Sequence, residues 1–72
     1  METLKNLRKS AGKTAWKVAK EINVSINTVF RYENGKRTLP IELVPTLAKM
    51  YNEDYETIVR CAINSKNISP SN

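Results

Sequence analysis

The sequence contains no histidine and a single cysteine, Cys61. Without histidine the chain lacks the usual general base of enzymes and the commonest metal ligand, and one cysteine cannot form an internal disulfide. No pair of acids, nucleophile or metal-ligand cluster has suitable neighbours for catalysis. We therefore expect a protein that is not an enzyme and that binds no metal and no cofactor.

Long apolar runs are missing as well. Charged residues occur from Glu2 onward, and neither a membrane span nor the hydrophobic region of a signal peptide is present. Seventy-two residues are enough for one domain with one small core. We expect a cytoplasmic protein without a membrane partner.

The net charge of +5 is concentrated in the first half of the chain. Residues 1–37 hold nine basic and three acidic side chains, whereas residues 38–72 hold three basic and four acidic ones. A basic half suits contact with a polyanion such as a nucleic acid. Charge alone leaves open the alternative that the lysines only keep the protein soluble.

Apolar residues recur at helical spacing, which predicts an all-α fold of five helices. The predicted ranges are 3–10, 15–22, 26–34, 41–51 and 55–63. The fourth helix has an alternative start near Val44, because Pro45 is tolerated only in a first turn. The positions on the apolar stripes are Leu4, Leu7, Ala11, Val18, Ala19, Ile22, Val24, Val29, Tyr32, Ile41, Val44, Leu47, Ala48, Tyr51, Tyr55, Ile58, Val59 and Ala62.

Short polar residues and glycines mark where these helices begin and end. Thr14, Ser25 and Asp54 are suited to N-caps, and Gly12 and Gly35 to left-handed C-terminal positions. We expect a domain over residues 1–63. Residues 64–72 are predicted to form a flexible polar tail, since they have almost nothing to bury.

The predicted helices 15–22 and 26–34 are joined by a tight turn at residues 23–25. Asn23 suits the sharp bend because asparagine tolerates positive φ. This spacing matches the helix-turn-helix, whose first helix lies across the DNA backbone and whose second enters the groove. Spacing alone does not separate it from other helical hairpins.

The run GKTAWKVAKEINVSINTVFRYENGKR at residues 12–37 resembles the helix-turn-helix core of the lambdoid repressor and Cro (Xre-type) family. The segment YENGKR is its most specific part, and LAKMY at residues 47–51 extends the resemblance to about residues 4–60. The resemblance implies a five-helix lambda-repressor-like bundle that binds operator DNA, usually as a homodimer. In that family an arginine on the first helix pairs with the glutamate that ends the third, and Arg8 and Glu33 match those positions. The alternative is that both side chains are merely solvated.

One stripe of the 26–34 helix provides the candidate base contacts. Arg31 can donate to guanine, Asn27 can pair with adenine, and Ile26 or Phe30 can cover a thymine methyl. The candidate phosphate contacts flank this helix or lie at the start of the helix before it. They are Lys13, Thr14, Ala15, Lys17, Asn34, Lys36 and Arg37.

Two positions depart from the family pattern. Ala15 replaces a common glutamine, and Ile26 replaces a common polar or basic residue. Together Trp16, Ile26 and Phe30 put large apolar groups on or beside the groove-facing side, which often marks a protein contact. Trp16 has the alternative of folding back on the first helix.

Small single-domain members of the family resemble Cro-type repressors and modulator-of-repression antirepressors of temperate phages. The first hypothesis is thus a DNA-binding transcriptional regulator of a phage lysis/lysogeny switch, in the cytoplasm of the bacterial host, that opposes a companion repressor. The second is an antirepressor that binds the companion repressor's DNA-binding domain directly, through Trp16, Ile26 and Phe30.

Overall fold

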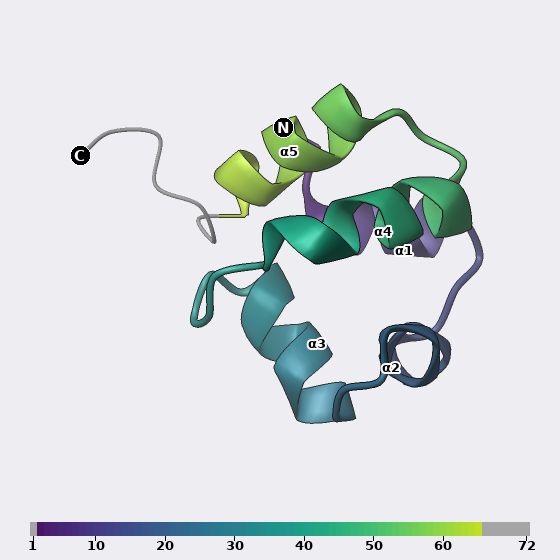
Figure 1. Cartoon of the computed structure of the whole chain (residues 1–72), viewed down its shortest axis with the longest axis vertical. Helices are drawn as coiled ribbons and strands as arrows, with labels where there is room; N and C mark the ends of the chain where they lie inside the picture. Colours follow the sequence, from purple (N-terminus) through teal and green to yellow (C-terminus); the bar gives the residue numbers. More distant parts are fainter. Residues whose placement is uncertain (1, 66–72) are drawn as a thin grey trace.

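The computed structural model describes residues 2–65. Within these residues the fold is all-helical, as predicted, with five α-helices, one short 3₁₀ helix and no strand (Figure 1). The elements are α1 (Leu4–Ser10), α2 (Ala15–Ile22), α3 (Ile26–Glu33), η1 (Ile41–Leu43), α4 (Val44–Tyr51) and α5 (Tyr55–Asn64).

Side-chain oxygens cap four of the five α-helices. Thr14 Oγ1 accepts a hydrogen bond from the Lys17 N–H at 3.1 Å. In the same way the Ser25 side chain accepts from the Thr28 N–H at the start of α3, and the Asp54 side chain accepts from the Thr57 N–H at the start of α5. These are the predicted caps. Thr3 does the same for α1, so this helix begins one residue later than predicted. Each cap satisfies an amide that helix geometry leaves without an intrahelical partner.

The turn between α2 and α3 is fixed by local backbone geometry. Asn23 has φ 61° and ψ 49°, the left-handed conformation that its side chain tolerates. The Val24 N–H then donates to the Ala19 carbonyl at 3.0 Å, and the half-buried Val24 side chain packs against the core. The second helix of the pair therefore leaves the turn in a defined direction.

The 41–51 segment does not form one continuous helix, the first of the two alternatives predicted for the fourth helix. It divides into η1 and α4, with Pro45 in the first turn of α4, so the alternative start near Val44 is the observed one. Ile41, predicted on an apolar stripe, is 70% exposed, whereas Leu39, which was not among the predicted apolar positions, is buried. A 3₁₀ turn winds three residues per turn, which takes Ile41 out of register with the buried face of α4.

The ends of α3 and α5 also differ from the predictions. α3 ends at Glu33, with Asn34 as its C-cap. α5 extends to Asn64, and Ser65 is its buried C-cap, so both residues belong to the helical domain rather than to a tail. Tyr55, predicted on the buried stripe of α5, is 60% exposed. The rest of the predicted tail, residues 66–72, lies outside the described residues.

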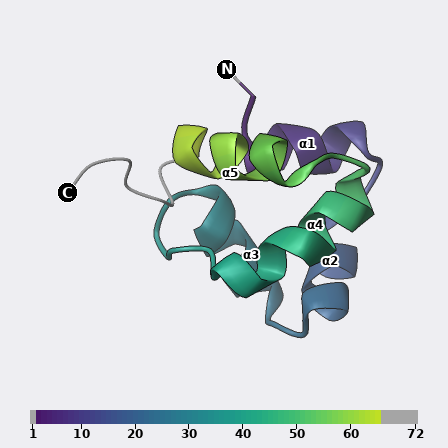
Figure 2. The same ribbon diagram turned by 45° about the horizontal axis from the view of Figure 1, so that its top comes forward.

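One hydrophobic core joins all five helices. Ile58 and Cys61 of α5 and Val18 of α2 are its most deeply buried large side chains. α1 and α5 lie side by side at one end of the molecule and α2 and α3 at the other, with α4 between them (Figures 1 and 2). The inner side of the α2–α3 pair thus packs against the common core, and its outer side faces away from the other helices.

Candidate nucleic-acid interface

α3 has two chemically different faces. Its inward face consists of the buried residues Thr28, Val29, Tyr32 and Glu33. Every predicted base-contact residue lies on the other side and is exposed, namely Ile26, Asn27, Phe30 and Arg31. The helix thus presents two hydrogen-bonding and two apolar side chains to whatever approaches this end of the molecule.

The start of α2 offers backbone donors. The Lys17 and Val18 amides are bonded to Thr14, whereas helix geometry leaves the Ala15 and Trp16 amides of the first turn without intrahelical acceptors. The Ala15 side chain is buried, so only its amide can reach a phosphate. An anion at this helix end would meet N–H groups and the positive end of the helix dipole.

A second basic group follows α3. The Lys36 and Arg37 amides both donate to the Arg31 carbonyl, at 2.9 and 3.3 Å, and Gly35 takes a positive φ of 74° to allow this turn. The side chains of Asn34, Lys36 and Arg37 are exposed. The turn thus holds the two cations beside the C-terminal end of α3.

The two remaining predicted phosphate contacts, Lys17 and Lys13, already interact with other groups of the protein. Lys17 Nζ lies 3.7 Å from Glu21 Oε1, but both side chains are about half exposed, so this ion pair is weak. Lys13 is half-buried, and its carbonyl accepts a hydrogen bond from Arg8.

The structure brings Arg8 and Glu33 into direct contact. Arg8 Nε donates to Glu33 Oε2 at 2.6 Å and Arg8 Nη2 to Glu33 Oε1 at 3.1 Å, a two-pronged ion pair. Both side chains are less than a tenth exposed. The hydrogen bond to Glu33 raises the pKa of Arg8, although burial opposes it. Since Arg8 Nη1 also donates to the Lys13 carbonyl at 3.2 Å, one guanidinium ties α1 to the end of α3 and to the loop before α2.

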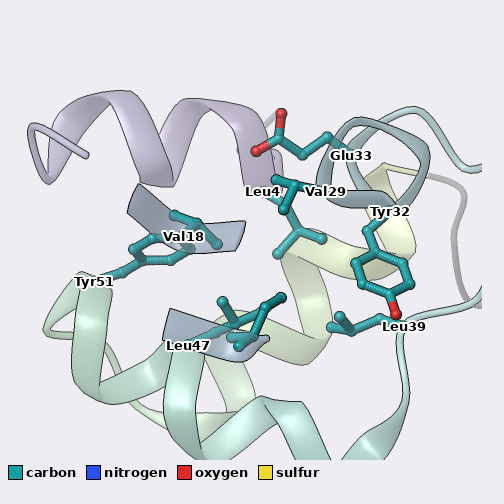
Figure 3. Close-up of a pocket in the computed structure, with 9 residues that line it drawn as sticks. Leu4, Val18, Val29, Tyr32, Glu33, Leu39, Leu47 and Tyr51 are labelled. Carbon is teal, nitrogen blue, oxygen red and sulfur yellow. The ribbon is translucent and has the colours of Figure 1, made fainter. Parts of the chain in front are cut away.

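The ion pair borders the apolar interior. Glu33 is one of the residues that line a cavity of about 10 Å³, together with Leu4, Val29 and Tyr51. This space is at most that of one water molecule, so it has no room for a larger ligand. In Figure 3 Glu33 lies close to Leu4 and Val29, and Tyr51 lies farther away, next to Val18. Burial, and after it the negative charge of Glu33, raise the pKa of Tyr51. Tyr51 therefore stays neutral well above its ordinary titration range.

Trp16 does not fold back on α1. It is 60% exposed, and Lys20 Nζ lies 5.0 Å from the centre of its ring, within range of a cation–π interaction. A shallow open hollow beside it is lined by Trp16, Ala19, Lys20, Val24 and Ile26. Sequence reasoning missed this contact between Lys20 and Trp16, although the two residues are spaced i, i+4 on α2.

The sequence model of the helix-turn-helix family matches residues 4–58, which include α1 to α4 and the capped start of α5. The chain belongs to the Xre-type helix-turn-helix family. Members of this family are DNA-binding regulators, so the predicted resemblance is confirmed at this level.

A curated relative extends this result. The chain is 33% identical over 58 residues to the antitoxin PezA of Streptococcus pneumoniae. The match covers 81% of this chain and 37% of PezA, so the chain spans little more than a third of the length of that relative. No solved structure matches the chain significantly.

Residues 2–65 contain no group of three or more histidine, cysteine, aspartate or glutamate side chains arranged to hold a metal ion. None of the described helices combines the length and the apolar character needed to cross a membrane.

Proposed function

We propose that the chain is a sequence-specific transcriptional regulator that inserts α3 into the major groove of double-stranded DNA. One observation carries this proposal. One side of α3 is exposed and carries Ile26, Asn27, Phe30 and Arg31, while the opposite side is buried in the core. Family membership supports the same function. The regulator acts in the cytoplasm of a bacterial cell, is not an enzyme and needs no cofactor.

Base recognition falls to the two polar side chains. Arg31 donates both ends of its guanidinium to the O6 and N7 of one guanine, and Asn27 pairs through its amide with an adenine. Ile26 and Phe30 lie at the same surface and pack against thymine methyl groups.

Backbone phosphates are held on both sides of α3. Lys13, Lys17 and the Ala15 amide with its Thr14 cap meet one strand at the start of α2, where the helix dipole adds to the attraction. Asn34, Lys36 and Arg37 meet a phosphate beyond the end of α3. These contacts set register and affinity but carry no sequence information.

Two substitutions separate base contacts from phosphate contacts. Arg31→Ala should cost about 1–3 kcal/mol of specific binding and relax the preference at one base pair. Lys36→Ala should weaken specific and nonspecific binding alike and reduce the dependence of log K on log salt by about one unit. Both are measured by fluorescence anisotropy on an operator selected from random duplexes, at several salt concentrations.

Lys49→Ala is the matched control, because Lys49 is an exposed cation in the last turn of α4 and has no place in the proposed interface. It should leave the operator affinity within about twofold of the original. DNA binding that neither Arg31→Ala nor Lys36→Ala alters would contradict the proposed orientation of α3.

A second candidate function is favoured by the exposed apolar residues. Trp16, Ile26 and Phe30 are 60%, 39% and 40% exposed, and clustered exposed apolar side chains often mark a protein contact. In this alternative the chain is an antirepressor of a temperate-phage lysis/lysogeny switch and binds the DNA-binding domain of a companion repressor. Trp16→Ala or Phe30→Ala should then abolish a complex with the repressor encoded beside the chain, and Arg31→Ala and Lys36→Ala should leave DNA binding unchanged.

A further inference from the structure

The exposed side of α3 is divided lengthwise into two rows of different chemistry. An α-helix turns by about 100° per residue, so side chains four positions apart fall into one row. Ile26 and Phe30 form an apolar row, and Asn27 and Arg31 form a hydrogen-bonding row beside it. An approaching surface therefore meets apolar groups along one flank of α3 and polar donors along the other.

The apolar row is held in place by the protein itself. Ile26 and Phe30 are 39% and 40% exposed, so more than half of the surface of each residue is already covered. A side chain that is already held loses little rotamer freedom when a ligand binds. The part that stays open is small, which suits contact with a small apolar group such as a methyl.

The two rows match the two halves of a base pair in the major groove. The purine half presents hydrogen-bonding atoms, N7 and O6 of guanine or N7 and N6 of adenine. The pyrimidine half presents C5, which carries a methyl group in thymine and a hydrogen in unmodified cytosine. With α3 lying along the groove, the hydrogen-bonding row faces purines of one strand, and the apolar row faces C5 of the pyrimidines paired with them.

Arg31 and Phe30 are neighbours in the sequence but lie in different rows. The proposed function assigns a guanine to Arg31, so Phe30 lies on the side of the cytosine paired with that guanine. Unmodified cytosine has no methyl group to offer the ring of Phe30. A methyl group added at C5 of this cytosine would lie against the ring and would be withdrawn from water, which is favourable.

We propose that Phe30 reads the C5 position of the cytosine opposite the guanine of Arg31, so that 5-methylation of this cytosine strengthens the binding of DNA. The inference rests on the proposed function and adds a regulation to it, because methylation of the operator then sets the affinity. Ile26 and Asn27 are the corresponding neighbours at the start of α3. There Ile26 contacts the methyl group of the thymine paired with the adenine of Asn27.

Fluorescence anisotropy of the full chain on duplexes with one modified base tests this inference. The starting duplex is the operator selected from random unmethylated sequences, and the base pair of Arg31 is the one at which Arg31→Ala relaxes the preference. Exchanging its cytosine for 5-methylcytosine should tighten binding about fourfold, the gain expected when one methyl group leaves water. Exchanging the thymine at the pair that Asn27→Ala relaxes for deoxyuridine should weaken binding by about the same factor, because it removes one methyl group.

The variants assign each effect to one side chain. Phe30→Ala should bind the methylated and unmethylated operators equally, and Ile26→Ala should bind the thymine and deoxyuridine operators equally. Tyr55→Ala is the matched control and should keep both effects, because Tyr55 is an exposed aromatic residue on α5, at the other end of the molecule from α3 (Figure 1). A 5-methylcytosine outside the contacted base pairs should change nothing, and circular dichroism verifies that each variant is folded.

Equal or weaker binding of the methylated operator overturns the inference, as does a methyl effect that persists in Phe30→Ala. An Arg31 position that is not a G·C pair overturns it too. In all of these outcomes the chain still binds a selected operator, so its function as a DNA-binding regulator stands while the reading of methyl groups is wrong. A chain that selects no operator from the random duplexes overturns both.

Discussion

Replacing Arg8 by methionine should destabilise the protein more than any single substitution of an exposed charge. Methionine keeps much of the aliphatic volume of arginine but removes the guanidinium. The Glu33 carboxylate, which is less than a tenth exposed, then loses both of its hydrogen bonds from Arg8. The Lys13 carbonyl also loses the hydrogen bond that it accepts from Arg8 Nη1. The effect therefore arises from a buried charge left unpaired and not from a cavity.

The magnitude follows from burial. Removing one partner of a buried ion pair costs about 3–5 kcal/mol. A chain of 72 residues has a total stability of about 4–11 kcal/mol at the usual 0.05–0.15 kcal/mol per residue. Arg8→Met should therefore leave the protein marginally folded. The double variant Arg8→Met/Glu33→Leu removes both charges and should recover most of the loss, because a buried pair is often no more stable than an apolar one.

Urea denaturation followed by far-ultraviolet circular dichroism measures these free energies of unfolding. The coupling between the two positions should be at least about 1 kcal/mol and opposite in sign to the loss from Arg8→Met. Lys5→Met, an exposed cation on the same helix, is the control and should change stability by no more than about 0.5 kcal/mol. The reasoning fails if Arg8→Met costs less than about 1 kcal/mol, or if the double variant is no more stable than the single one.

Two further predictions concern the core. Ala19→Leu should destabilise by about 1–3 kcal/mol through overpacking, because Ala19 is 5% exposed on the face of α2 toward the core; an unchanged melting temperature would count against this packing. Burial raises the pKa of Tyr51, so its contribution is fully present below the unfolded-state pKa of about 10 and is lost as pH rises toward the folded-state value. Stability measured between about pH 8 and 11 should therefore fall more steeply in the original protein than in Tyr51→Phe, and parallel curves would refute this assignment.

The parts of the fold that the sequence predicted are those set by local chemistry. Thr14, Ser25 and Asp54 cap helices because a hydroxyl or carboxylate three residues before an amide needs only short-range geometry. Asn23 turns the chain with φ 61° for an equally local reason. The two faces of α3 follow from its helical period, which by itself separates the candidate base contacts from the core residues.

The parts that the sequence missed depend on distant partners. Ser65 looks like a tail residue, but its Oγ accepts the Leu4 N–H at 3.0 Å and donates to the Cys61 carbonyl at 2.7 Å. The hydrogen bond from Leu4 joins residues 61 positions apart, so the periodicity of apolar residues along the sequence cannot predict it. Ile41 and Leu39 were missed for a related reason. Ile41 lies in the 3₁₀ turn and is exposed, whereas Leu39 is buried from the irregular segment before Pro40, where no helical period can predict burial. Tyr55 fitted the period of α5 at its very start, where the helix extends beyond the core.

The salt dependence of binding distinguishes the two candidate functions by its sign. DNA is a polyanion, so the cations Lys36 and Arg37 that flank α3 release counterions when they bind it, and affinity falls steeply as salt is added. The DNA-facing side of a companion repressor is itself basic by function, and these same cations would repel it. Screening that repulsion should make an antirepressor complex tighter, or leave it unchanged, as salt rises. The exposed Trp16, Ile26 and Phe30 would then have to supply its affinity through apolar contact, a contribution that salt does not weaken. One titration against DNA and one against the repressor, in the same buffers, therefore assign the face of α3 to one partner or the other.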